Sequence, residues 1–224
     1  MPVTLYGTIV SPPTRATLML LEILDITVDF KEINLPTREH YKPEYLAKNP
    51  LHTVPMIEDD GFTVVDSHAI MTYLVTKYGG ANHCNMYPQE LKLRTLVDQK
   101  LYFDASVLFP RVRNVIYDIA LGGSNLGSPH PTQFQLKQIE EAYAFADAFL
   151  QKTKYIARDE LTVADLSCVT TICSLDTIVP VDYEKYDKLY AWWDGLKKES
   201  WYQNKNVPGA TLFSDFMNSL LRRR

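Results

Sequence analysis

The sequence predicts a small α/β domain followed by a larger all-helical domain. Within residues 1–80 the hydrophobic pattern changes repeatedly between short β-like runs and helical segments, whereas residues 89–224 show helical spacing nearly throughout. At 224 residues and 46% hydrophobic content, the chain is long for one compact domain and sufficient for two cores. We therefore predict a first domain over residues 1–80, a linker over 81–88 and a helical domain over 89–224.

The first domain begins with the order strand, helix, strand. Residues 3–6 are rich in β-forming side chains and are followed by Gly7. The length and the Leu and Met content of residues 14–24 favour a largely buried helix, and residues 26–33 alternate between apolar and polar. This βαβ order implies parallel pairing of the two strands through a right-handed crossover.

The second part of this domain is predicted as strand, strand, helix. Residues 54–57 and 62–65 flank Glu58-Asp59-Asp60-Gly61, in which the Asp-Gly pair indicates a hairpin. A helix from Ser67 to about Tyr78 should end at Gly79-Gly80. Residues 38–47 are expected to form a short or irregular helix. Together these elements predict a mixed four-stranded sheet with helices against it.

The second domain should open with a helix of about thirty residues from Gln89, because apolar residues recur there at helical spacing. Pro110 lies inside this helix and should bend it. In the segment from Leu161 to Leu166, Thr162 can cap a further helix, with Asp165 at its third position. The other helices are predicted over residues 136–150, 186–197 and 212–221.

Composition excludes several classes of function. The formal net charge of -4 and the pI near 5.7 offer no basic field for nucleic acid or an anionic membrane, and Arg222 to Arg224 are expected to be a solvated tail. No apolar run approaches the roughly eighteen residues that span a bilayer, and no secretory signal is evident, so a cytoplasmic protein is expected. Cys84, Cys168 and Cys173 lack C-x-x-C spacing, which favours packing roles and no metal. Motifs of nucleotide hydrolysis, dinucleotide redox chemistry, zinc proteolysis and esterases are missing.

Three segments join strands to helices or loops and have two interpretations each. In "GTIVSPPTRA", Ser11 can cap the following helix, or the helix N-terminus can hold an anion. In "NPLHTVP", Pro55 can be an ordinary edge proline, or a cis Val54-Pro55 bond can offer the Val54 backbone to a ligand. In "VDSHAI", Asp66 or Ser67 can cap a helix, or the pair can bind a carboxylate and an ammonium group.

Taken together, these segments resemble cytosolic glutathione S-transferases, specifically the insect epsilon class and next the related delta class. The resemblance covers the whole chain and implies a thioredoxin-like first domain and a helical second domain. It is carried by Ser11-Pro12-Pro13 with Arg15-Ala16, by "LAKNPLHTVP" over residues 46–55, by Asp66-Ser67-His68-Ala69-Ile70 with Tyr73-Leu74, and by Leu161-Thr162-Val163-Ala164-Asp165.

The resemblance implies a site for glutathione along the first domain. Its cysteine moiety would pair with the Val54 backbone beside a cis Pro55, next to Thr53. Its γ-glutamyl end would meet Asp66 and Ser67, with His68 close by. Its glycine end would lie near His40 and His52. Many members of the delta and epsilon group have Glu where this chain has Asp66, so that contact would be longer or bridged by water.

The resemblance also makes Ser11 the catalytic residue, as a hydroxyl that donates a hydrogen bond to the glutathione thiolate. Tyr6 is the rival, since other classes use a tyrosine near the end of the first strand. Of two nearby arginines, Arg113 rather than Arg111 would approach glutathione. The hydrophobic substrate is expected between the domains, against Leu35, Phe109, Val112, Ile116 and Phe213, unless these side chains are ordinary core.

The function implied is conjugation of glutathione to hydrophobic electrophiles, as in detoxification, with glutathione peroxidase activity toward organic hydroperoxides as a further activity. The resemblance also implies a homodimer. One alternative is a weakly catalytic or non-catalytic carrier of hydrophobic ligands such as hormones or xenobiotics. A second alternative, a thiol-disulfide or dehydroascorbate-type reductase, is disfavoured because Ser11 stands where a cysteine nucleophile would be needed.

Overall fold

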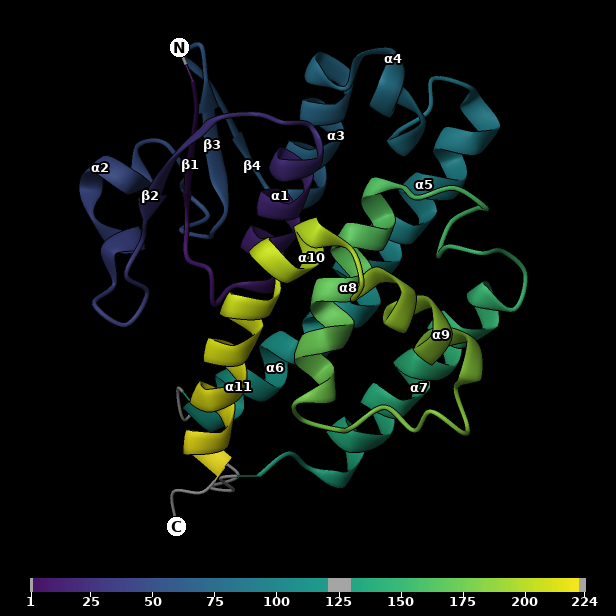
Figure 1. The fold of residues 1–224 in the computed structure, drawn as a ribbon. Helices are drawn as coiled ribbons and strands as arrows, with labels where there is room; N and C mark the ends of the chain where they lie inside the picture. The colour runs from purple at the N-terminus through teal and green to yellow at the C-terminus, as the bar shows by residue number, and fades with distance from the viewer. Residues whose placement is uncertain (1, 121–129, 222–224) are drawn as a thin grey trace.

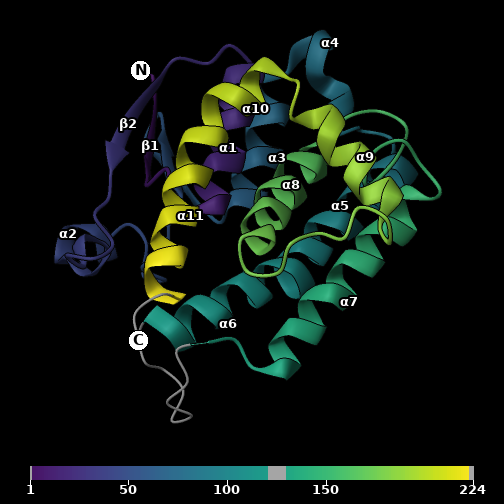
Figure 2. The same cartoon turned by 60° about the horizontal axis from the view of Figure 1, so that its bottom comes forward.

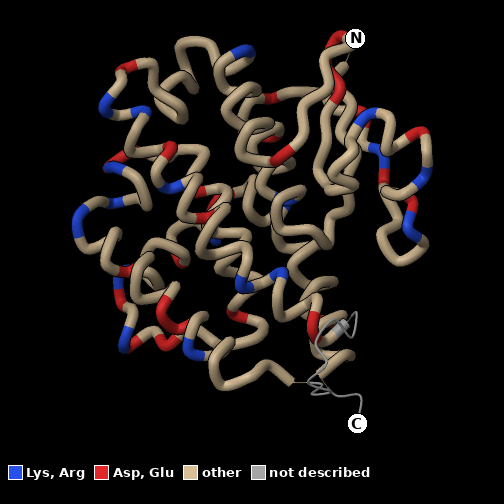
Figure 3. The backbone as a smooth tube through the Cα atoms, turned by 180° about the vertical axis from the view of Figure 1, so that it is seen from behind, with Lys and Arg blue, Asp and Glu red and all other residues tan. Residues whose placement is uncertain are grey.

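The computed structural model describes residues 2–120 and 130–221, and the C-terminal arginine run lies outside these ranges. It shows the α/β part and the helical part that the sequence predicts (Figure 1). None of the helices among the described residues is long and apolar enough to cross a membrane. Lys and Arg are interspersed with Asp and Glu along the backbone seen in Figure 3, as a near-balanced composition implies.

The sheet has the strand order β2-β1-β3-β4 and is mixed, as predicted. β1 pairs parallel with β2 and antiparallel with β3, and β3 pairs antiparallel with β4. Asp60 and Gly61 alone connect β3 to β4, and their φ angles of 50° and 80° are those that a two-residue hairpin of type I′ requires. The strands are β1 (Val3–Gly7), β2 (Val28–Glu32), β3 (Met56–Asp59) and β4 (Phe62–Val65).

Helices cover both faces of this sheet (Figure 1). α1 (Pro12–Ile23) and α3 (Ser67–Tyr78) lie on one face, where Leu5 and Ile57 enter the main core. The 3-10 turn η1 (Glu39–Tyr41) and α2 (Pro43–Leu46) lie on the other. Because side chains alternate along a strand, Tyr6 and Met56 point to this second face and join a smaller cluster around Tyr45.

The rest of the chain is helical. The predicted helices are present, and two short ones, α4 and α10, were not predicted. Their bounds are α4 (Gly80–His83), the 3-10 turn η2 (Cys84–Met86), α5 (Leu91–Phe103), η3 (Asp104–Leu108), α6 (Phe109–Ala120), α7 (Gln133–Leu150), α8 (Val163–Asp176), α9 (Asp187–Leu196), α10 (Ser200–Lys205) and α11 (Val207–Leu221).

The long helix that contains Pro110 is interrupted by a π-helical turn, η3, which ends two residues before the proline. Proline has no N–H and its ring clashes with the carbonyl four residues earlier, which here belongs to Ser106 inside η3. The wider turn of a π-helix relieves that clash without ending the helix. The helix is therefore irregular next to the proline at which a bend was predicted, and the π turn carries Asp104 into the core, where it is 3% exposed.

One continuous core joins the two parts of the chain. α8 lies at its centre, between α1 of the first part and α5 and α6 of the second (Figure 2). All its residues except Cys173 and Asp176 are buried. Because α8 contacts both parts, the sheet and the helical bundle hold each other in place.

The start of α8 depends on Asp165, which is fully buried. Its carboxylate accepts hydrogen bonds from the N–H groups of Ile156 (2.8 Å) and Thr162 (2.9 Å), the Thr162 hydroxyl (2.9 Å) and the Trp192 indole (3.0 Å). Desolvation raises the pKa of Asp165 even though these donors favour the charged form. Thr162 donates its hydroxyl hydrogen to Asp165, so the two residues are linked at the helix N-terminus as predicted.

Replacing Asp165 with alanine should destabilise the fold strongly, because three buried N–H donors would lose their acceptor. We expect a loss of about 3 kcal/mol or more in the free energy of unfolding, measured in urea. Glu90→Ala is the matched control, since Glu90 accepts two N–H groups at the exposed start of α5 and should cost about 1 kcal/mol. Equal losses for the two variants would contradict this role of Asp165.

Candidate functional site

Ser11 lies where the chain leaves β1 and enters α1. Its backbone is extended (φ -74°, ψ 122°), its N–H donates to the Thr8 carbonyl at 3.0 Å, and its carbonyl accepts the N–H of Arg15 at 3.0 Å. The hydroxyl makes no capping hydrogen bond. Pro13 removes the N–H of the second helical position, one of the two that an N-cap side chain can serve, and the hydroxyl does not bond the other, that of Thr14. The capping interpretation of Ser11 is therefore wrong, and its partly exposed hydroxyl stands at the positive end of α1 without a structural partner among the described residues.

The loop before β3 contains a cis Val54-Pro55 peptide bond, as the resemblance implies. Buried Asn49 shapes this loop: its amide donates to the Thr53 carbonyl at 2.9 Å and its oxygen accepts the Leu51 N–H at 3.0 Å. The Tyr45 hydroxyl donates to the same Thr53 carbonyl at 2.6 Å. Across the described residues, the Val54 N–H and carbonyl have no such partner, so both remain open to an extended peptide.

His40 and His52 are separated in sequence, but the fold brings their side chains close together. Their ring centroids lie 6.4 Å apart, and the Tyr41 ring lies between them, 4.5 Å from each. Desolvation, followed by the charges of His52 and Arg38, lowers the pKa of His40. Its Nδ1 is buried and has no hydrogen-bond partner among the described residues, which leaves one polar atom of this cluster unsatisfied.

Asp66 is the N-cap of α3, so the capping interpretation holds for this residue. Its carboxylate accepts the N–H groups of His68 (2.9 Å) and Ala69 (3.5 Å), and its φ of 72° lies in the left-handed region. Burial acts to raise the pKa of Asp66, but the hydrogen bonds and charge of His68 outweigh it and lower the pKa. Ser67, the first residue of the helix, is 4% exposed. An acceptor and a helix N-terminus therefore lie side by side.

His68 connects this corner to the helical part. Its Nδ1 lies 2.9 Å from Asp66 Oδ1 and its Nε2 lies 3.0 Å from Asp104 Oδ2. The Ser167 hydroxyl of α8 donates to the same Asp104 oxygen at 2.6 Å. Burial acts to lower the pKa of His68, but the two carboxylates raise it to about 9. Sequence reasoning missed Asp104, whose only signal was an acidic residue inside a long apolar helix.

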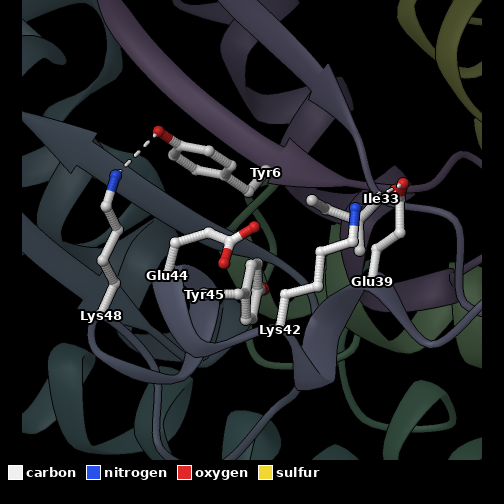
Figure 4. Close-up of a pocket in the computed structure, with 7 residues that line it drawn as sticks. All are labelled: Tyr6, Ile33, Glu39, Lys42, Glu44, Tyr45 and Lys48. Atoms are coloured by element: carbon white, nitrogen blue, oxygen red, sulfur yellow. Dashed lines mark hydrogen bonds and ion pairs between the residues drawn. The ribbon is translucent and has the colours of Figure 1, made fainter.

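Tyr6, the rival of Ser11, is engaged on the α2 side of the sheet. Its hydroxyl donates to Glu58 at 2.5 Å and accepts from Lys48 at 3.2 Å. Desolvation and the Glu58 hydrogen bond raise its pKa. Figure 4 shows its ring pointing toward Lys48 above Tyr45, in a cavity of about 200 Å³ that none of the predicted glutathione-binding side chains lines. A phenol held in this way is not available to a thiol.

The residues predicted to meet a hydrophobic substrate fall into two groups. Val112 and Phe213 are 0% and 2% exposed, so they belong to the core. Leu35, Phe109 and Ile116 are partly exposed. These three keep surface that a ligand can contact.

The two arginines of α6 differ as their spacing predicts. Arg111 is committed to α7, where it bonds the Gln138 carbonyl at 2.6 Å and pairs with Glu141 at 3.2 Å; it also bonds the Val107 carbonyl. Arg113 is exposed and has no such partner among the described residues. Of these two arginines, Arg113 is therefore the one whose guanidinium has no partner among the described residues.

The free energy of unfolding should fall as pH rises, because His68 loses the proton that favours its contacts with Asp66 and Asp104. Because the pKa of His68 is raised from 6.5 to about 9, its contribution is fully present below pH 6.5 and is lost as pH rises through about 9. The loss is at most about 3 kcal/mol. Urea unfolding of wild type between pH 6 and pH 10 should show it, and His68→Gln should remove it. His83→Gln, in α4, should keep the wild-type profile; a profile unchanged by His68→Gln would refute the prediction.

Comparisons with known proteins agree with this geometry. The family model "Glutathione S-transferase, N-terminal domain" matches residues 1–76, and "Glutathione S-transferase, C-terminal domain" matches residues 131–198. "Glutathione S-transferase 1" of Manduca sexta is 40% identical over 223 residues, covering 99% of this chain and all of the relative.

Solved structures extend the comparison to the fold. An epsilon-class glutathione S-transferase from the housefly, Musca domestica, superposes with a TM-score of 0.93 at 41% identity, covering 97% of this chain and 98% of the other. A glutathione transferase homologue of Drosophila mojavensis with bound glutathione gives a TM-score of 0.91 at 41% identity, with 97% of each chain covered. The chain therefore belongs to the glutathione S-transferase family, whose enzymes transfer groups to glutathione, and is similar in structure to its insect epsilon class.

Proposed function

We propose that this enzyme conjugates reduced glutathione to hydrophobic electrophiles and that Ser11 stabilises the thiolate. The observation that carries the choice of residue is the contrast between two hydroxyl groups. Tyr6 already donates to Glu58, whereas the Ser11 hydroxyl has no partner among the described residues and stands at the N-terminus of α1.

Ser11 acts by shifting a proton equilibrium, not by attacking the substrate. A thiol has an ordinary pKa of about 8.5 and is mostly protonated at neutral pH. A hydroxyl donor and the positive end of a helix both favour the thiolate. Lowering the thiol pKa by about one to two units amounts to about 1.4–2.7 kcal/mol. The thiol proton passes to solvent, the sulfur forms a bond to the electrophilic carbon, and the leaving group departs with its electron pair.

The proposed glutathione site runs from Ser11 across residues 1–80, which we propose as the glutathione-binding domain, joined by residues 81–88 to the helical domain. The open backbone of Val54, after Thr53 and beside cis Pro55, would pair with the cysteine moiety. Asp66 would accept a hydrogen bond from the ammonium group of the γ-glutamyl residue. Ser67, with the start of α3, would bind the carboxylate of the same γ-glutamyl residue. The remaining expected contacts are Arg113 and, at the glycine end, His40 and His52.

His68 would support Asp66 rather than touch glutathione, since both its ring nitrogens lie at hydrogen-bond distance from carboxylates. The pair leaves Asp66 charged, with its side chain 60% exposed. This arrangement suits a short carboxylate that must bind an ammonium group from solvent.

The electrophile would bind beside the sulfur, against the apolar side chains that keep exposed surface. These are Leu35, Phe109 and Ile116, whereas Val112 and Phe213 lie in the core. An apolar surface of this kind would suit hydrophobic substrates and organic hydroperoxides alike. We extend the proposal to a cytoplasmic location.

Ser11→Ala should reduce conjugation of a chromogenic aryl halide at neutral pH by about tenfold or more, because less thiolate is present. The free energy of unfolding should change by less than about 0.5 kcal/mol, since the hydroxyl makes no hydrogen bond to any of the described residues. Tyr6→Phe and Ser200→Ala, the latter at the exposed start of α10, should keep most of the activity.

The carrier alternative gives a different result in the same assay. A protein that binds glutathione and hydrophobic ligands but turns over none of several electrophiles would be a carrier, and the enzyme proposal would fail. If turnover depends on Tyr6 instead of Ser11, the assignment of the catalytic residue fails while the transferase activity stands.

We also propose that the chain is a homodimer. Leu91 and Tyr102 of α5 are 75% and 71% exposed and lie on one face of the helix, eleven residues apart. Exposed apolar side chains that line up in this way suit an interface. Sedimentation should give about twice the chain mass of 25.7 kDa.

Tyr102→Glu should shift the sedimentation equilibrium toward monomer, because it places a charge in the proposed interface. Tyr117→Glu, which changes another exposed tyrosine on α6, should leave the mass unchanged. A wild-type protein that sediments as a monomer at micromolar concentration would overturn the dimer.

A further inference from the structure

Arg15 is a buried cation one helical turn after Ser11. Its side chain is 0% exposed, although arginine is among the residues least often found fully buried. Its backbone N–H bonds the Ser11 carbonyl at 3.0 Å. A buried charge is costly unless something favourable opposes it, so its position calls for a physical reason.

The guanidinium of Arg15 joins three parts of the fold. Nη1 donates to the Val10 carbonyl at 3.3 Å, directly before Ser11. Nη2 donates to the Ser174 hydroxyl at 2.7 Å and the Thr170 carbonyl at 3.4 Å in α8. The Phe213 ring of α11 lies 6.0 Å from the guanidinium carbon.

α11 approaches the loop before Ser11 so closely that position 209 of this helix requires a glycine. A Cβ added at Gly209 would lie 1.9 Å from the Ile9 carbonyl oxygen and 2.8 Å from Arg15 Cδ. The helical domain therefore closes over Arg15 and removes water from it. Under these conditions the charge is weakly screened and acts over a longer distance than it would at the surface.

The structure supplies no carboxylate for this charge. Within the described ranges no Asp or Glu pairs with Arg15, and its Nε has no hydrogen-bond partner. The titratable groups that face it are the Cys173 thiol of α8 and the Tyr202 phenol of α10. Desolvation lowers the pKa of Arg15 to about 10, so the side chain is still cationic at neutral pH.

We propose that Arg15 is a positioning residue for the transferase reaction, whose buried charge stabilises the thiolate that forms beside Ser11. The inference rests on the proposed role of Ser11. Arg15 acts from inside the fold: it holds the carbonyl before Ser11 and contributes positive potential where the reaction places a negative charge. The missing counter-charge is then the thiolate of the substrate.

The test is the pKa of the thiol of enzyme-bound glutathione, followed by the ultraviolet absorbance of the thiolate as pH is varied. Arg15→Gln removes the charge but keeps an N–H donor, and should raise this pKa by about one unit. Arg15→Lys keeps the charge and should leave most of the shift in place. The acid limb of the kcat/KM profile should move upward with Arg15→Gln, and kcat should approach the wild-type value at high pH.

Lys100→Met is the matched control, because Lys100 is another buried cation, 6% exposed, in α5. Its Nζ bonds Gln99 and lies 3.8 Å over the Phe149 ring, and it has no carboxylate partner among the described residues. This variant removes a buried charge of the helical domain and should leave the thiol pKa unchanged. His40, His52, Asp66 and His68 are the same in all these variants, so the comparison isolates the change at Arg15.

The outcomes separate this inference from the proposed function. If the bound thiol of wild type is no more acidic than free glutathione, the role of Ser11 fails. If Ser11→Ala raises the thiol pKa and Arg15→Gln does not, only the role of Arg15 fails. If Arg15→Gln does not fold, Arg15→Lys decides the question. A thiol pKa unchanged in Arg15→Lys supports the proposed role of the Arg15 charge, and a rise of about one unit overturns that role.

Discussion

The packing of α1 between the sheet and α8 is the constraint on which the rest of the molecule depends. α1 begins at the site, at Ser11, and most of its first ten residues are buried. On one side it covers β1 and β3, and on the other it meets α8 at the centre of the helical domain. The position of the Ser11 hydroxyl is therefore fixed by contacts that neither domain could make alone.

The same packing explains why several charges lie inside the fold. Asp165 and Asp104 are both buried, and each is surrounded by donors that repay part of its lost hydration. His68 extends the Asp104 cluster to Asp66 at the surface. Arg15 differs from these groups because hydrogen-bond acceptors, not a carboxylate, surround it. Lys100 is likewise a buried cation without a carboxylate partner among the described residues, and what distinguishes Arg15 from it is the position beside Ser11.

Local chemistry made much of the first domain predictable. The Asp60-Gly61 turn, the βαβ order and the stop after Tyr78 each follow from short-range backbone preferences, and the structure confirms them. The cis bond before Pro55 could be predicted only from the family resemblance, because the sequence equally allows a trans edge proline. Ser11 was ambiguous for a similar reason: the residue type suits a cap, and only the structure shows that the hydroxyl makes no capping hydrogen bond.

Long-range contacts account for what could not be predicted. The π turn at Asp104 relieves a local clash with Pro110. The hydrogen-bond partners of Asp104, however, are His68 of α3 and Ser167 of α8, which are distant in sequence. The burial of Val112 and Phe213 likewise depends on helices that are distant in sequence. Periodicity identifies an apolar face without showing whether protein or ligand covers it.

A crystal structure with glutathione bound tests the assignment of Ser11 most directly, through the distances from the sulfur to two oxygen atoms. We predict that the sulfur lies at hydrogen-bond distance from Ser11 Oγ, while Tyr6 remains bonded to Glu58. A sulfur bonded to the Tyr6 hydroxyl and remote from Ser11 would contradict the assignment.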